Sequence, residues 1–302
     1  MAFIQKNEKI KEKNKHPTIL KIPDELWDKI KSIFPKEKPL KTVGRRIVPY
    51  RKVIDGILYV LRTGCQWKML PKEYGSGSTC HRRFQEWNSL DIFKKVWIRL
   101  LKIYDDCIGI NWTWQSIDSI SIKSPLGGDD RKQSTDRSKL GTKRHILTDK
   151  KGIPLSVVIS SANTHDIKLV TDVIDNAVIK RPSSYKTKKI GRRKRRKLQH
   201  LCLDKAYNSE PEEQELIKRG YVLHIPPKRK RDEKEEQEAK ITVQHCSNRK
   251  KHSAKRWVVE RTNSWHNRFR KLFTRYEKKS ENYLGLVQLS CCMIIYRKII
   301  LG

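Results

Sequence analysis

The most informative stretch of the sequence is residues 256–276, RWVVERTNSWHNRFRKLFTRY. At about 100° per residue on a helical wheel, one side of it is mostly apolar. That side carries Val258, Thr262, Trp265, Phe269, Leu272, Phe273 and Tyr276. The pattern predicts a single amphipathic helix. Its polar side has one carboxylate, Glu260, surrounded by arginines. Such an acid is either an ion-pair partner on a solvated face or a ligand that helps to hold a cation.

The composition indicates a partner with many negative charges. The 302 residues contain 68 Lys and Arg against 33 Asp and Glu, which gives a formal net charge of +35. A field of this sign attracts polyanions, of which nucleic acid is the commonest. An anionic membrane is the alternative. However, the apolar stretch from Tyr283 to Tyr296 is interrupted by Gln288 and Ser290 and is shorter than the roughly 20 residues of a membrane span. We therefore expect nucleic acid and not a membrane.

The N-terminal arm and the cysteines indicate where the protein works. Residues 1–22 are rich in Lys and Asn and lack the apolar segment of a secretory signal, so they are interpreted as a basic arm. The seven cysteines are odd in number and contain no C-x-x-C, which favours neither a disulfide framework nor a zinc site. Cys291 and Cys292 are expected to be packing residues of an apolar helix. We expect a cytoplasmic protein associated with the nucleoid.

Residues 23–108 have the pattern of a small helical domain. Apolar residues recur at helical spacing in residues 24–34, 50–62, 78–87 and 91–104. The third segment takes Ser78 or Thr79 as its N-cap and exposes Arg82 and Arg83 beside buried aromatic residues. This pattern is typical of the recognition helix of a helix-turn-helix, which lies in the major groove of DNA. An ordinary helical bundle with a basic surface fits the spacing equally well.

Residues 109–302 change to the period-two alternation of a β-sheet. Strands are predicted at residues 112–122, 145–148, 153–160, 198–204 and 221–225, and helices at residues 163–178, 209–220 and in the final stretch. This order predicts an α/β fold in which helices flank a mixed five-stranded sheet. Residues 186–197, KTKKIGRRKRRK, are predicted to be a basic loop that faces nucleic acid.

Two carboxylates belong to strands that this sheet would place side by side. Asp118 occupies an otherwise apolar strand face, and a buried carboxylate is costly unless it is paired or holds a metal. Asp204 ends the strand that follows the first helix of this half, where a simple helix cap is the alternative. The two strands are expected to be neighbours near the centre of the sheet. The last helix could bring Glu260 to the same edge.

Three carboxylates close together require a counter-charge. Two Mg²⁺ ions about 4 Å apart would supply it, and oxygen ligands suit Mg²⁺ better than zinc. Two such ions promote in-line attack on a phosphodiester, because one activates water or a 3′-OH and the other stabilises the leaving oxygen. The sequence therefore predicts a phosphodiester-cleaving centre with two Mg²⁺ ions, for which Mn²⁺ would substitute.

Several blocks of the sequence resemble the DDE transposases of prokaryotic insertion sequences, which share an RNase H-like catalytic domain. In the second half these blocks are SIDSISIKS, TDRSKLGTKRHILTDKKGIPLSVVISSANTHD, LCLDKAYNSEPEEQELIKRGY and RWVVERTNSWHNRFRKLFTRYE. In the first half, IPDELWDKI and ILYVLRTGCQWKMLPKEYGSGSTCHRRFQEW are similar to the helical N-terminal domain of that group. The resemblance covers most of the chain, except the basic arm and the charged stretch near residue 235.

The resemblance implies roles for individual residues. Asp118, Asp204 in D-K-A-Y and Glu260 in R-x-x-x-E would form the metal-holding catalytic triad. Arg256 would contact a DNA phosphate near the cut, where a guanidinium fits bidentately. Further DNA contacts are expected from Arg82, Arg83, Lys143, Arg261, Arg268 and Lys271.

Two positions depart from the fuller signature of related elements. Ser253 stands where that signature has Tyr, and Asn267 stands where it has Lys. Arg268 and Lys271 lie close along the same predicted helix and are candidates to take over the phosphate contact. The resemblance therefore leaves the handling of the strand near the cut open.

The activity that the resemblance implies is DNA transposition. The protein would bind the terminal inverted repeats of its element through the front domain, cleave the 3′ ends and join them to target DNA. Its partner would be double-stranded DNA, on which the protein would self-associate. Two alternatives stay open: a catalytically inactive DNA-binding regulator derived from a transposase, and a structure-selective nuclease of the same RNase H-like fold.

Overall fold

The computed structural model of the chain describes residues 19–37, 47–127, 141–181, 187–190, 193–196, 199–207, 209–226 and 256–301. Most of the predicted basic arm, Ser253 and the charged stretch near residue 235 lie outside the described residues.

The front of the chain folds as helices, as the apolar spacing predicts. They are α2 (Asp24–Ile30), α3 (Tyr50–Thr63), α4 (Gly77–Ser89) and α5 (Ile92–Cys107), with 3-10 turns η1 (Lys31–Ile33), η2 (Trp67–Met69) and η3 (Lys72–Tyr74). Helix α4 begins earlier than predicted. Its N-cap is Ser76, whose Oγ accepts a hydrogen bond from the backbone N–H of Thr79 at 3.1 Å. The prediction of Ser78 or Thr79 as the cap is therefore wrong.

The second half contains the predicted mixed sheet. Its strands are β1 (Trp114–Lys123), β2 (Gly141–Asp149), β3 (Pro154–Ser161), β6 (Gln199–Cys202) and β7 (Tyr221–His224). Their order across the sheet is β3-β2-β1-β6-β7, with β1 antiparallel to β2 and parallel to β6. The strands of the two predicted aspartates are thus central neighbours. The predicted architecture is confirmed: a mixed five-stranded sheet flanked by helices and preceded by a helical region.

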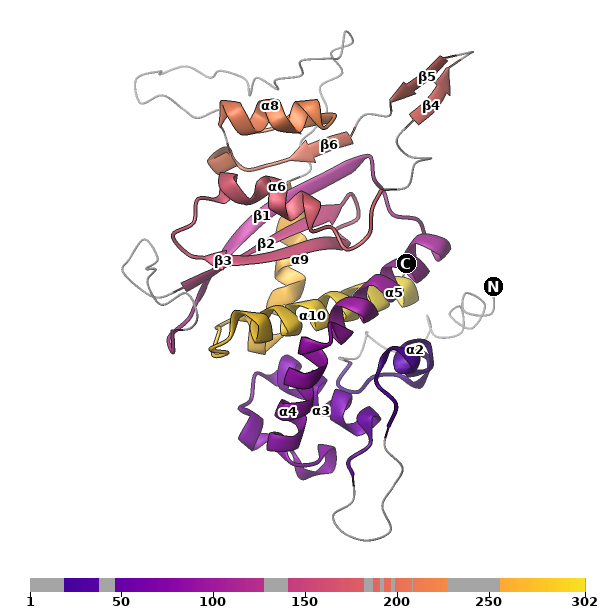
Figure 1. Cartoon of the computed structure of the whole chain (residues 1–302), viewed down its shortest axis with the longest axis vertical. Coiled ribbons are helices and arrows are strands. Elements are labelled where there is room, and N and C mark those ends of the chain that lie inside the picture. Colours follow the sequence, from indigo (N-terminus) through magenta and orange to yellow (C-terminus); the bar gives the residue numbers. More distant parts are fainter. Residues whose placement is uncertain are drawn as a thin grey trace.

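Helices lie on both faces of this sheet. They are η4 (Asp166–Leu169) with α6 (Val170–Asp175), η5 (Lys205–Tyr207), α8 (Glu210–Lys218), α9 (Trp257–Asn267), η6 (Arg270–Leu272) and α10 (Ser280–Leu301). The register pairs Asp118 with Ile146, so Arg144, two residues before Ile146, shares that face. Asn263 of α9 bonds to both Asp118 and Arg144, whereas Lys143 points to the other face and bonds to η4. Figure 1 shows α6 and α9 on either side of the sheet.

Helix α10 connects the sheet to the front helices. It packs against α5 and β3, and most of its side chains between Asn282 and Tyr296 are buried. Cys291 and Cys292 are buried free thiols in it, which confirms them as packing residues. Among the described residues, one helix, Ser280–Leu301, is long enough and apolar enough to cross a membrane. However, 72% of its apolar window is buried inside the protein. Figure 1 shows α10 running between the front helices and the sheet. The domain boundary after residue 108 stays a prediction.

Residues 256–276 do not form one helix, so that prediction is wrong. Helix α9 ends at Asn267, and the chain turns at Phe269, which has an extended backbone and is 2% exposed. After η6, Thr274 forms a parallel bridge with Lys123 at the end of β1. The turn occurs because Phe269 is buried under the front helices, where the guanidinium of Arg62 lies 3.9 Å from the centre of its ring.

The break in the helix changes which side is buried. Phe273 and Tyr276 are 64% and 52% exposed instead of sharing an apolar side. The buried residues of α9 are Val258, Val259, Thr262, Asn263 and His266.

The predicted loop at residues 186–197 also differs from the structure. It contains strands β4 (Thr187–Ile190) and β5 (Arg193–Arg196), which pair antiparallel in a separate ladder.

Candidate active site

The parallel pairing of β1 with β6 places two of the predicted acids at one sheet edge. Ser116 of β1 lies opposite Cys202 of β6. Two residues further along both strands, the same register puts Asp118 level with Asp204. Asp204 lies just past the end of β6, and its Oδ1 accepts a hydrogen bond from the backbone N–H of Lys205 at 2.7 Å. The two carboxylates therefore follow two neighbouring central strands in the same direction.

The turn between β2 and β3 anchors the helix that carries the third acid. Thr262 Oγ1 donates to the carbonyl of Gly152 at 2.7 Å, and Arg261 Nη2 donates to the carbonyl of Lys151 at 2.8 Å. Gly152 has a φ of 83°, and an added Cβ would lie 2.8 Å from Thr262 Oγ1. Only glycine permits this approach. The anchor fixes the part of α9 that follows Glu260.

Arg256 links the second and third acids. Its Nη1 lies 3.2 Å from Asp204 Oδ1, and its Nη2 lies 2.9 Å from Glu260 Oε1. Asp118 is held from the side of α9, where its Oδ2 accepts a hydrogen bond from Asn263 Nδ2 at 3.1 Å. The side chains of Asp204 and Glu260 are 34% and 47% exposed, so the cluster is open to solvent. Asp204 and Glu260 therefore share one guanidinium, and Asp118 is joined to α9 through Asn263.

The electrostatics of Asp118 favour a bound cation. Burial raises the pKa of Asp118 above its ordinary value, and the nearby Glu260 carboxylate raises it further. The backbone N–H of Ser119, the charge of Arg256 and the amide of Asn263 act in the opposite direction. A raised pKa means that the ionised carboxylate is disfavoured here. A cation at this edge would offset that cost.

Two residues that the sequence analysis does not single out complete the cluster. Asn263 uses both ends of its amide, because its Oδ1 accepts from Arg144 Nη2 at 3.5 Å while its Nδ2 donates to Asp118. Arg144 is fully buried in β2. Asn263 had a signal in the sequence, since it follows Glu260 by three residues, which places both on one side of a helix. Arg144 had none, because it precedes the strand predicted at residues 145–148.

The donor set fits a hard divalent cation. All three groups are carboxylates, the ligand type that Mg²⁺ takes, and Arg256 already places positive charge between Asp204 and Glu260. Among the described residues, no three His, Cys, Asp or Glu side chains converge closely enough to hold one metal ion. Each Mg²⁺ ion commonly takes only one or two carboxylates, with water and substrate phosphates completing its shell. The arrangement therefore suits ions that bind together with a phosphate substrate.

Two of the predicted DNA contacts are engaged within the protein. Lys143 lies on the sheet face opposite to Asp118, with its Nζ 2.9 Å from Asp166 Oδ1. Arg83 Nη1 lies 2.6 Å from Glu86 Oε2, and its side chain is 21% exposed. Neither residue belongs to the acid cluster.

Arg82, by contrast, is exposed on α4. It borders a cavity of about 450 Å³ between α4 and η2, lined by Gln66, Trp67, Lys68, Ser78, His81, Arg82 and Gln85. Polar, basic and aromatic side chains of this kind are those that contact nucleic acid. The helix-turn-helix interpretation of this region stays a prediction.

Three predicted DNA contacts lie on or just beyond α9. Arg261 stacks between Trp257 and Trp265, with its guanidinium 4.8 Å and 5.0 Å from their ring centres. Arg268 is exposed at the end of the helix. Lys271 is only 7% exposed because the helix ends before it and η6 turns it inward, where its Nζ lies 3.5 Å from Glu277 Oε1. Lys271 is thus placed inside the protein, and the position does not suit the phosphate contact expected of it.

Two family models match the chain. The model described as "Putative transposase of IS4/5 family (DUF4096)" matches residues 22–97, and the model described as "Transposase DDE domain" matches residues 115–295. The first therefore corresponds to the front helices. The second corresponds to the sheet, α9 and most of α10, and it includes all three acids of the cluster.

Relatives of known sequence agree with these matches. The chain is 37% identical over 111 residues to the "Insertion element IS402 uncharacterized 16.2 kDa protein" of Burkholderia cepacia, a match that covers 35% of this chain and 76% of that protein. It is 29% identical over 171 residues to the "Putative transposase for insertion sequence element IS402" of the same organism, covering 54% of this chain and 66%, just under two thirds, of that relative.

A solved structure was also matched, a chain in the "Crystal structure of a pre-cleavage Mos1 transpososome", with 11% identity over 88% of this chain and 80% of that chain. Its TM-score of 0.27 is too low to establish a common fold. The sequence matches are decisive, since the DDE model spans more than half of the chain. The chain belongs to the transposase DDE domain family.

Proposed function

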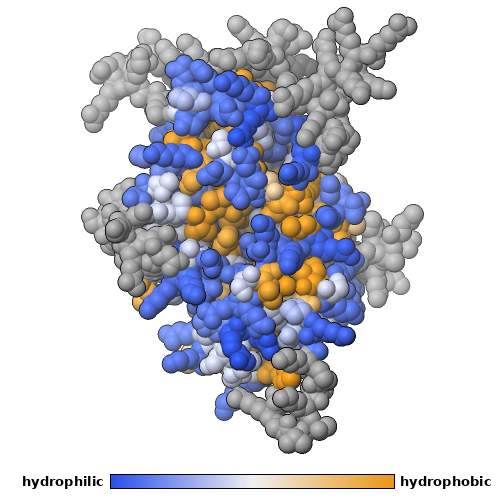
Figure 2. Space-filling model, viewed as in Figure 1, coloured by the Kyte–Doolittle hydropathy of each residue, from blue (hydrophilic) through white to orange (hydrophobic). Residues whose placement is uncertain are grey.

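We propose that this protein is the transposase of an insertion sequence. It binds the terminal inverted repeats of the element, cleaves the 3′ ends and joins the freed 3′-OH groups to target DNA. The observation that carries the proposal is that Arg256 pairs with both Asp204 and Glu260, while Asn263 of the adjoining helix α9 holds Asp118 of β1. The polar cavity beside Arg82 and the net charge of +35 support DNA as the substrate. Figure 2 shows hydrophilic residues over much of one face of the molecule.

The three acids would hold two Mg²⁺ ions, and Mn²⁺ would substitute for them. When bound, such ions supply activation of the attacking oxygen and stabilisation of the leaving oxygen in phosphodiester cleavage. Asn263 keeps the Asp118 carboxylate oriented toward the cluster. Arg256 balances the charge of Asp204 and Glu260 before DNA arrives, and a guanidinium of this kind also fits a phosphate bidentately. Because two ends are joined to one target, we expect the protein to self-associate on DNA. We expect it to act in the cytoplasm, at the nucleoid.

Cleavage of an end fragment tests the proposal. The substrate is a labelled duplex that carries one terminal inverted repeat, incubated with the full chain and Mg²⁺ or Mn²⁺. We expect 3′-end cleavage and strand transfer by the wild-type protein. Asp118→Ala, Asp204→Ala and Glu260→Ala should each abolish cleavage while leaving binding of the fragment nearly intact. Asp172→Ala, which removes an exposed aspartate of α6, is the matched control and should cleave normally.

The same assay separates the alternatives. A wild-type protein that binds the ends but does not cut them with either metal is a DNA-binding regulator. A protein that cuts branched or supercoiled DNA without regard to the end sequence is a structure-selective nuclease. Normal cleavage by any one of the three acid variants would remove that residue from the proposed triad.

A further inference from the structure

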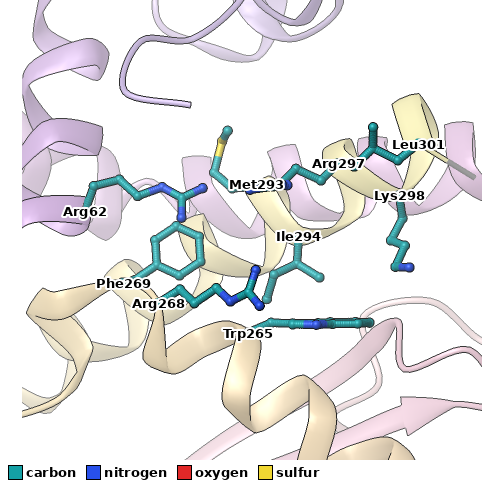
Figure 3. Close-up of a pocket in the computed structure, with 9 residues that line it drawn as sticks. All are labelled: Arg62, Trp265, Arg268, Phe269, Met293, Ile294, Arg297, Lys298 and Leu301. Atoms are coloured by element: carbon teal, nitrogen blue, oxygen red, sulfur yellow. The ribbon is translucent and has the colours of Figure 1, made fainter. Parts of the chain in front are cut away.

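A cavity of about 150 Å³ lies where the front helices meet the end of α9 and α10. It is lined by Arg62, Trp265, Arg268, Phe269, Met293, Ile294, Arg297, Lys298 and Leu301. Figure 3 shows Arg62 entering from α3, Arg268 from the end of α9, and Arg297 and Lys298 from α10. Four cations from three segments therefore border one small space. No acid of the described part of the chain is among its lining residues.

Arg62 is the residue that distinguishes this cavity from an ordinary basic surface. It is 7% exposed, and within the described residues its Nε and Nη2 are buried without a hydrogen-bond partner. Its guanidinium lies 3.9 Å from the centre of the Phe269 ring, a contact that stabilises the cation but satisfies none of its N–H groups. A buried guanidinium whose N–H groups lack hydrogen-bond acceptors is costly unless a ligand supplies those acceptors.

The charges around the cavity reinforce one another. Burial, together with the charges of Arg297 and Arg268, lowers the pKa of Arg62 to about 10. Burial likewise lowers the pKa of Lys298, with Arg261, Arg297 and Lys151 acting in the same direction. Positive groups that lower one another's pKa in this way create a positive potential in the cavity. A bound anion would offset that potential.

The walls of the cavity are fixed by close packing. Helix α3, which carries Arg62, ends at Gly64, where the backbone has a φ of 74°. A Cβ at Gly64 would lie 3.0 Å from the Cβ of Arg270 in η6, so the two segments are in contact. Lys298 is held with its Nζ 5.0 Å from the centre of the Trp265 ring. Arg62 and Lys298 are therefore preorganised.

We propose that this cavity is an anion site that binds one phosphate group, with Arg62 as its buried donor and Arg268, Arg297 and Lys298 around it. The size permits this, because about 150 Å³ is many times the roughly 10–15 Å³ that a single water needs. The phosphate comes either from a nucleic-acid backbone or from free phosphate. The first source rests on the proposed transposase function, whereas phosphate binding itself does not.

Thermal stability measures phosphate binding without any catalysis. Inorganic phosphate and pyrophosphate are added to the full chain at constant ionic strength, with chloride as the reference anion. The melting temperature of the wild type should rise with phosphate, since a ligand that binds only the folded state stabilises it. Arg62→Met keeps the contact with Phe269 and should lose this rise. Arg99→Met, which removes an exposed arginine of α5, should keep it.

Binding to a duplex identifies the source of the phosphate. If the site holds a backbone phosphate, Arg62→Met should reduce the slope of log K against log salt by about 0.9, and Arg99→Met should not. An unchanged slope together with a lost phosphate shift would identify free phosphate. Should Arg62→Met fail to fold, Arg297→Gln takes its place in both measurements.

The proposed site would be refuted if phosphate did not raise the melting temperature of the wild type and all variants had the same slope of log K against log salt. Asp118→Ala should retain the phosphate shift. Loss of cleavage and loss of the anion site are therefore separate outcomes.

Discussion

Asn263 Nδ2 donates a hydrogen bond to Asp118 Oδ2 over 3.1 Å, and this contact joins α9 to the central strand of the sheet. The amide cannot be reversed without loss, since its Oδ1 accepts from the buried Arg144 at 3.5 Å. The buried arginine therefore fixes the direction of the amide, and the amide fixes the carboxylate. If Asp118 holds metal as proposed, a side chain that orients its carboxylate affects activity without touching the substrate.

Replacing Asn263 by Ala should lower the rate of end cleavage by about 10-fold to 100-fold, the usual range for a residue that orients a metal ligand. DNA binding should change little, because Asn263 is buried. The half-saturating Mg²⁺ concentration in the cleavage assay should rise together with the loss of rate. Asn176→Ala, which removes an exposed amide of the sheet half, is the control. A slower reaction with unchanged Mg²⁺ dependence would argue against an orienting role.

Replacing Asp118 by Asn should stabilise the metal-free protein while abolishing cleavage. Burial raises the pKa of Asp118, so the folded state disfavours its charge. This cost is absent below the ordinary carboxyl pKa of about 3.9 and develops as the pH rises through the elevated folded value. At neutral pH we expect a gain of about 1 kcal/mol, a rise of roughly 2–4 °C in melting temperature. The gain should vanish at about pH 4. A gain of equal size at every pH would refute this origin.

The position of the acids could be predicted because each had a local signal. Asp118 breaks the apolar face of a period-two strand, and Asp204 ends a short buried strand. A parallel neighbour relation then follows from the order of strands and helices, and the register of β1 with β6 agrees with it. Glu260 was marked as the one carboxylate among arginines on the polar side of a helical pattern.

The error over residues 256–276 arose because tertiary contacts override local periodicity. The apolar spacing continues through residue 276, but Phe269 gains more by packing beneath Arg62 than by extending α9. Once the chain turns there, Lys271 is directed inward and Phe273 outward. Nothing in a helical wheel reports the neighbour that makes such a turn favourable. For the same reason the cavity beside Arg62 has no signature in the sequence, since its cations come from three distant segments.

The stability of the protein should fall in mild acid because of His266. Burial, with the nearby charge of Arg144, lowers the pKa of this fully buried imidazole well below its ordinary value of about 6.5. The neutral ring hydrogen-bonds with Ser290 Oγ at 2.7 Å. The contribution of the neutral imidazole to the free energy of unfolding is therefore complete above about pH 6.5, and it is lost as the pH falls below that value.

Replacing His266 by Gln, which cannot be protonated, should remove about 1.4 kcal/mol per pH unit from the loss of stability below pH 6. Some loss should persist, because burial also lowers the pKa of His145, to about 4. Urea unfolding at pH 7, 6 and 5 measures both slopes. His165→Gln, outside the protein core, serves as the control. Parallel slopes for wild type and His266→Gln would exclude His266 as the source.

Glu277 joins the front helices to the segment after η6, and breaking this contact should destabilise the fold. It is 8% exposed and accepts a hydrogen bond from Trp67 Nε1 at 3.2 Å, while Lys271 Nζ lies 3.5 Å away. Glu277→Gln keeps an acceptor for Trp67 but leaves the ammonium buried without its carboxylate, which should cost about 3 kcal/mol in urea unfolding. Adding Lys271→Met should restore most of that loss, because the remaining groups no longer include an unpaired buried charge. Asp28→Asn, in an exposed pair with Lys31, should change stability by less than about 0.5 kcal/mol. If the double variant were no more stable than Glu277→Gln alone, the buried ammonium would not be the cause.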